Sequence, residues 1–356
     1  MATFRRAKVV EVVESSEGLC RARLALDDGE IIAAGFPGML GPLAPGDAVI
    51  VNTTAVDLEL GTGGEGFILW NLDGPGPSGP GAGHIVKLRY TPWQTEVLAA
   101  EAPESPDHDA LRAADSIAGV PVVACGLHSQ IAGVAAGVKA ARPDARVGYL
   151  MTDGAALPIA WSKLVGALKK SGLVETTCTA GHAFGGDIEA VNVFSGMAAL
   201  VHARSADVVV AAMGPGVVGT GTALGFTALE QGQLLDAATA LGGRSVACLR
   251  ISFADPRLRH SGVSHHTITA LKVAAREPSV LVLPVLPGAA HNHLRGRLER
   301  VGLDARHEIV TVDGAPGLEL LATRGVPVSS MGRSIEEIPE LFLAAAAAGR
   351  FAAEQL

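Results

Sequence analysis

The first 95 residues consist of short apolar runs separated by turns, without helical periodicity. Runs such as AKVVEVV, CRARLAL and AVIVN are bounded by segments rich in Gly, Pro and Asp. Apolar residues at alternate positions pack one face of a strand against a core, and Gly and Pro favour tight turns. We therefore predict a small antiparallel β-barrel or sandwich over residues 1–95.

From residue 119 the pattern changes, and apolar runs alternate with segments of helical periodicity. Repeated strand–helix units favour a parallel sheet with helices on its faces. We expect an open three-layer sandwich, with a closed eight-unit barrel as the alternative for a region of this length. The predicted strands are residues 120–125, 146–152, 175–180, 207–213, 244–252, 279–286, 307–312 and 326–331.

Two further stretches have a distinct composition. Residues 96–118 are polar and contain prolines, which is typical of a linker between domains. Residues 335–356 are rich in alanine and predict a helix. Either close packing against a neighbouring subunit or high helix propensity accounts for this composition, so a homo-oligomer is left open.

Composition narrows the class of protein. Hydrophobic residues make up 48% of the 356 residues and the formal charge is −8, so we expect a well-packed chain that does not bind nucleic acid. The uncharged stretch 208–229 is long enough to span a bilayer, but Pro215 and its neighbouring glycines would leave backbone groups unsatisfied there. No signal peptide is expected, and a cytoplasmic protein would keep its cysteines reduced. The four cysteines are Cys20, Cys125, Cys178 and Cys248.

Histidine and aspartate gather in the loops that follow the predicted strands. Because these loops emerge at one edge of a parallel sheet, we expect them to form a site. Imidazole and carboxylate groups serve as acid–base catalysts or as metal ligands, although no HExxH spacing is present. Seven of the eleven histidines lie there: His128, His182, His260, His265, His266, His291 and His293. The catalytic candidates are His182, Asp187, His265, His266, Asp255, His128 and Asp153.

His182 ranks first among these candidates. It lies in the glycine-rich turn GHAFGGD, where Asp187 would cap a following helix. We expect His182 to act together with the SGVSHH segment about eighty positions downstream. His182, His265 and His266 are accordingly the candidate ligands of a divalent metal ion. A hydrogen-bonded loop residue or a helix cap is the structural alternative for each histidine.

The second glycine-rich loop, MGPGVVGTGT, follows an apolar strand and matches G-x-G-x-x-G. The match is imperfect, because Pro215 sits inside the turn and the following strand leads to Arg250 rather than to an acidic residue. Free N–H groups at a helix N-terminus would bind an anion, whereas close helix–strand packing is the structural alternative. The anion-binding candidates are Gly214, Gly216, Gly219, Thr220, Gly221, Thr222 and Arg250.

Several phrases of the chain resemble a bacterial family described only as a domain of unknown function, number 3866. They include VNTTAVDLELGTGG, KLRYTPWQ, TAGHAFGGDIEAVNVFSG and LRISFADPRLRHSGVSHHT, and they extend from about Val51 to Thr267. The resemblance implies that the β-rich and α/β parts belong to one conserved unit. It implies no activity, because the family has none assigned.

Three functions are therefore compared. The first is an enzyme that acts on a small anionic or phosphorylated metabolite through His and Asp groups, with a divalent metal ion as a candidate cofactor. The second is a regulatory protein that binds a nucleotide or metabolite without turnover. The third is a structural or assembly protein with buried loops.

Overall fold

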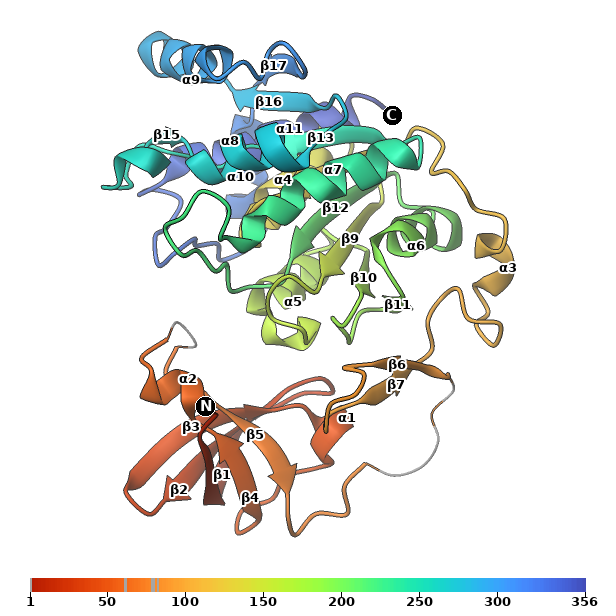
Figure 1. Ribbon diagram of the computed structural model, residues 1–356, viewed down its shortest axis with the longest axis vertical. Helices are drawn as coiled ribbons and strands as arrows, with labels where there is room; N and C mark the ends of the chain where they lie inside the picture. The colour runs from red at the N-terminus through yellow and green to blue at the C-terminus, as the bar shows by residue number, and fades with distance from the viewer. Residues whose placement is uncertain (1, 61–62, 78–80, 82) are drawn as a thin grey trace. The chain divides into compact units, whose positions relative to one another are not determined.

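The chain of this computed structural model forms two units (Figure 1). The structure describes residues 2–60, 63–77, 81 and 83–356. The first unit comprises Met1–Ala82 and Leu88–Glu96, and the second comprises Gly83–Lys87 and Val97–Leu356. Two short strands, β6 (Ile85–Lys87) and β7 (Thr95–Val97), lie where the chain passes between them.

The first unit is a closed five-stranded barrel, which confirms the predicted small antiparallel β-domain. Neighbouring strands are antiparallel except for the parallel pair β3–β5. The alternating pattern produces this barrel because every second side chain, such as Val49 and Val51, is fully buried. The strands, in barrel order, are β1 (Phe4–Ser15), β2 (Cys20–Leu26), β3 (Gly29–Gly35), β5 (Gly66–Asn71) and β4 (Ala48–Asn52). Two single-turn helices, α1 (Pro37–Leu40) and α2 (Thr54–Asp57), interrupt the loops.

The second unit is built on an open eight-stranded parallel sheet, so the open sandwich is confirmed and the closed barrel is wrong. Its central strands are mostly apolar, as expected for a sheet that is covered by helices on both faces. In sheet order they are β11 (Ile188–Ala190), β10 (Thr176–Ala180), β9 (Val147–Thr152), β12 (Val208–Met213), β8 (Pro121–Cys125), β13 (Arg244–Cys248), β16 (Val280–Pro284) and β17 (Glu308–Val312).

Three details of the strand prediction differ from the structure. The predicted strand 244–252 is divided into β13 and the short strand β14 (Ile251–Ser252), which is not part of this sheet. Residues 326–331 form no strand, and Ser330 makes only an isolated bridge with Arg333. The eighth strand is instead β11, which follows the glycine-rich turn after β10. Asp187 therefore precedes a strand and does not cap a helix. Asn192 is the N-cap of the next helix, where its side chain and Ser195 form a capping box.

Helices lie on both faces of the sheet, and Figure 1 shows α7 in front of it with α4 behind. One face carries α4 (Gln130–Ala141), α5 (Lys163–Lys170), α10 (Ala315–Thr323) and α11 (Pro339–Ala353). The other carries α6 (Val193–Ala198), α7 (Glu230–Ala240) and α9 (Gly288–Arg300), with the π-helical turns η2 (Ala199–Ala203) and η5 (Ala270–Ala274). The predicted linker, 96–118, contains α3 (His108–Leu111) and buries Ala99 and Ile117.

The alanine-rich helix α11 packs against α4 within the same unit. Ala344–Ala348 are fully buried, so these alanines form no exposed face for a neighbouring subunit. Glycines permit the close approach: a Cβ on Gly349 would lie 1.9 Å from the carbonyl oxygen of Val134.

Among the described residues, no helix combines the length and apolarity needed to cross a membrane. Residues 208–229 contain β12, a loop and the 3₁₀ turn η3 (Thr227–Leu229).

The connections of neighbouring strands leave the sheet toward opposite faces around β8. The chain runs from β8 into α4 on one face, whereas it runs from β12 and β13 into elements on the other face. In open parallel sheets, such a divergence opens a crevice at the carboxyl ends of the strands. This edge carries the loops with the predicted site residues.

Candidate functional site: a cluster of three histidines

Three histidines meet in the segment after β13. His260, His265 and His266, the histidine cluster, each offer one ligand atom, and these atoms lie within 4.8 Å of one another. Their ring centroids are 4.3 to 4.9 Å apart. Among the described residues, this is the group of His, Cys, Asp or Glu side chains whose spacing could hold a metal ion.

A two-residue strand pair assembles the cluster from residues that are separated in sequence. β14 (Ile251–Ser252) pairs antiparallel with β15 (Gly262–Val263), so the loop between them returns to its starting point. The 3₁₀ turn η4 (Leu258–His260) ends this loop and supplies the first histidine. Gly262 has φ +70°, a conformation that favours glycine, and a Cβ at this position would lie 3.2 Å from Nε2 of His293.

Ser264 fixes the other two histidines. Its side chain caps α8 (His265–Thr269) by accepting from the backbone N–H of His266. The capped turn places His265 and His266 at the first two helical positions. Ser264 is fully buried, and its Oγ also lies 2.8 Å from Nδ1 of His260. One hydroxyl group therefore links His260 to the start of α8, the helix that carries His265 and His266.

His265 contains an orphaned polar atom. Its Nε2 is buried and has no hydrogen-bond partner in the described structure. A buried polar nitrogen without a partner costs about 1–3 kcal/mol, and ligands or unobserved ions commonly explain such atoms. By contrast, Nδ1 of His260 contacts Ser264 Oγ, and Nδ1 of His266 contacts Nη1 of Arg250.

The electrostatic surroundings keep the histidines neutral. Burial, reinforced by nearby arginines, lowers the pKa of His260 to about 4. Burial and the neighbouring His265 lower the pKa of His266 to about 3. The pKa of His265 is also lowered, first by burial and then by Arg259. Neutral imidazoles have a free electron pair on one nitrogen, which is the form that binds metal ions.

Arg250 and Asp255 lie beside the cluster. Nη1 of Arg250 is 3.5 Å from Nδ1 of His266, and its Nη2 is 3.9 Å from Oδ2 of Asp255. Asp255 is bound more closely by Arg257, at 2.9 and 2.8 Å, and these hydrogen bonds hold the pKa of Asp255 well below its usual value. Asp255 is thus an ionised partner for arginines.

The glycine-rich loop after β12 forms one wall of the site, and some of its polar groups bond within the loop itself. A Cβ on Gly219 would lie 3.5 Å from the ring of His266, and Phe226 stacks on that ring at 4.0 Å. The N–H groups of Val218 and Thr220 donate to Thr227 Oγ1 and to the carbonyl of Gly225. In this conformation they are not available to a ligand. The hydroxyls of Thr220 and Thr222 bond within the same loop.

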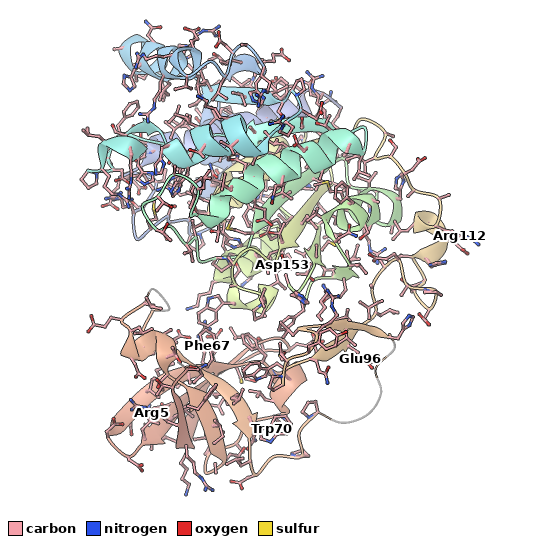
Figure 2. The ribbon with its side chains drawn as sticks, in the orientation of Figure 1. Arg5, Phe67, Trp70, Glu96, Arg112 and Asp153 are labelled. Atoms are coloured by element: carbon pink, nitrogen blue, oxygen red, sulfur yellow. The ribbon has the colours of Figure 1, made fainter. Side chains whose placement is uncertain are left out.

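The first-ranked candidate, His182, lies elsewhere along the sheet edge. Its backbone N–H donates to Asp153, which Figure 2 labels near the end of β9. Three strands, β9, β12 and β8, separate β10 from β13, so the two strand ends are roughly 19 Å apart. Asp187 is occupied by Thr177 and by an ion pair with Lys169. The metal-compatible trio contains His260 instead of His182.

His128 is a buried member of the core network. Its Nε2 lies 2.6 Å from Ser162 Oγ, and its Nδ1 lies 3.1 Å from the carbonyl oxygen of Met213. Burial lowers its pKa to about 4. With both ring nitrogens engaged, His128 connects β8 and β12 to α5, which is the structural alternative considered for it.

Comparison with known families gives one assignment. The model of the family described as "Protein of unknown function (DUF3866)" matches residues 32–349. The chain belongs to this family. No curated protein and no solved structure matches it. The match includes the histidine cluster and both glycine-rich loops, and it carries no activity for them.

Sequence reasoning did not single out His260, although it placed this residue on the site edge. The signal was the HSGVSHH segment: Ser261 and Gly262 permit a turn between His260 and the pair His265–His266. It also gave no role to Ser264, Phe226 or Met331. Met331 contacts Arg250 through its sulfur, 3.3 Å from Nη2.

Proposed function

We propose that this protein is a metal-dependent hydrolase whose divalent ion, Zn²⁺ in the first instance, is held by His260, His265 and His266. The observation that carries the proposal is the buried, unpartnered Nε2 of His265 in a group of three imidazoles with ligand spacing. Burial and capping hold these side chains in place before any ion binds, which favours affinity.

The donor set fits a catalytic rather than a structural zinc site. The three histidines would hold the ion and leave it able to bind water, and zinc would supply the chemistry of lowering the pKa of that water toward neutrality. The chain's own residues would supply the rest of the environment. Ser264 orients His260, as partners of metal-bound histidines commonly do. Phe226 and the loop at Gly219 limit access from one side.

The alternative, a nucleotide-binding regulatory protein, has less support. It depended on free N–H groups in the glycine-rich loop, and those of Val218 and Thr220 are used internally. The helix that follows also begins with Glu230, whose carboxylate is unfavourable for an anion at that helix end. No contact of the described residues favours a nucleotide over a smaller anion.

Turnover of chromogenic esters tests the proposal. We expect the zinc- or cobalt-loaded protein to hydrolyse at least one of a set of nitrophenyl esters of acetic and phosphoric acid. A chelator should abolish this activity. His265→Ala should lower it at least about a hundredfold, because loss of a ligand removes the ion.

His291→Ala is the matched control, since His291 lies on the same sheet edge in α9 but outside the cluster. It should retain activity. Hydrolysis that survives both chelation and His265→Ala would contradict the proposal.

A further inference from the structure

We propose that Arg250 binds the phosphate group of the substrate, so that the site acts on phosphate monoesters. This inference rests on the proposed function for its hydrolytic step, but the phosphate-binding site is argued from Arg250 itself. Arg250 lies two residues after the end of β13, immediately before β14, and only 6% of its surface is exposed.

The guanidinium group of Arg250 lacks a good acceptor. It carries five N–H donors, and its described contacts are His266 Nδ1 at 3.5 Å and Met331 Sδ at 3.3 Å. The first distance is at the limit of a hydrogen bond, and a thioether is a weak acceptor. The nearest carboxylate oxygen, on Asp255, is 3.9 Å away and already serves Arg257. A buried cation is normally paired with an anion, and an anionic ligand would give Arg250 the close acceptor that its described contacts do not supply.

The charge around the cluster favours a dianion over a monoanion. Four guanidinium groups act electrostatically on the cluster: Arg250, Arg257, Arg259 and Arg297. Asp255 is the carboxylate that acts on it in the opposite sense. A bound divalent ion would increase the positive excess further. A phosphate monoester carries two negative charges near neutral pH, and its oxygens match the planar fork of arginine.

The position of Arg250 also suits the proposed reaction. Because Nη1 lies next to His266, an oxygen held by Arg250 would be within reach of an ion held by the cluster. Water would form the new P–O bond while the ester P–O bond breaks. The leaving alcohol takes one proton from the water, and inorganic phosphate remains as the second product. No oxidant or further reactant is needed.

Calorimetric titration with inorganic phosphate tests this inference. Wild-type protein, Arg250→Gln and Arg250→Lys are compared, each with and without bound zinc. Arg295→Gln is the control, because Arg295 is exposed on α9 and pairs with Glu299. We expect phosphate to bind wild type and Arg295→Gln equally, and Arg250→Gln at least about tenfold more weakly. Arg250→Lys keeps the charge but not the fork, and should be intermediate.

Zinc content measured on the same samples separates the two proposals. Zinc retained by Arg250→Gln together with weakened phosphate binding supports the inference. Wild-type phosphate affinity in a folded Arg250→Gln, or no phosphate binding to zinc-loaded wild type, would overturn it and leave the metal site standing. Phosphate binding that depends on Arg250 without any zinc binding would support the anion site and contradict the hydrolase. Should Arg250→Gln fail to fold, wild-type affinity in Arg250→Lys would likewise overturn the inference.

Discussion

At the scale of single residues, the cluster depends on a few buried polar contacts. His265 leaves Nε2 without a partner, and Ser264 holds His260 and the start of α8 with one hydroxyl. Arg250 lies beside them with weak acceptors only. In the absence of a ligand, the unpartnered Nε2 of His265 and the weakly paired guanidinium group of Arg250 cost stability. A ligand that satisfies them would recover that free energy, which is why we place the site here.

Ser264→Ala tests the positioning role of this hydroxyl. We expect zinc affinity to fall about 10- to 100-fold, as for other residues that orient a ligand. The free energy of unfolding should also fall by about 1 kcal/mol through loss of the helix cap. Zinc titration and chemical denaturation measure the two effects separately. Ser264→Thr keeps a hydroxyl and should restore both. Unchanged zinc affinity in Ser264→Ala would show that Ser264 serves only as a cap.

His128 makes stability depend on pH. Its folded pKa is about 4, against 6.5 for the unfolded chain. As the pH falls below 6.5, the unfolded state takes up a proton that the folded state does not. The free energy of unfolding therefore decreases between pH 6.5 and 4, by up to roughly 3 kcal/mol from this residue. Denaturation at several pH values should show a smaller decrease in His128→Gln. An equal decrease in both proteins would assign the effect to other groups.

At the scale of elements, the contact between α4 and α11 is set by glycine. Gly349→Ala would place a methyl group 1.9 Å from the carbonyl oxygen of Val134, so the helices must separate. We expect the free energy of unfolding to fall by about 1–3 kcal/mol or more. Gly166→Ala in α5 is the control, because no atom lies within 4 Å of its Cβ position. It should be neutral or stabilising by up to about 1 kcal/mol. Equal effects in thermal denaturation would contradict this packing.

At the scale of the whole molecule, the alternation of apolar runs was enough to predict both units. Seven of the eight predicted strands belong to the sheet, because long buried runs such as residues 207–213 have few other conformations. β11 was missed, since three residues after a glycine turn give too short a pattern. Residues 326–331 resemble a strand locally, but no neighbouring strand pairs with them along their length.

The site was predictable only in part. The position of His265 and His266 on the carboxyl edge follows from strand–loop–helix order alone. The third histidine of the cluster could not be predicted in the same way, because the local sequence pattern does not determine the order of strands in the sheet. In the observed order, β12 lies between β9 and β8 and so separates His182 from His265. The return of the chain to His260 depends on a two-residue strand pair, which no periodicity marks.

The most direct test of the metal site is the zinc content of the purified protein after equilibrium dialysis. The three-histidine site predicts one bound zinc ion per chain in wild type and in His291→Ala. It predicts none in His265→Ala, with the fold intact by circular dichroism. A wild-type protein that binds no divalent transition metal, or a His265→Ala variant that binds zinc as wild type does, would contradict it.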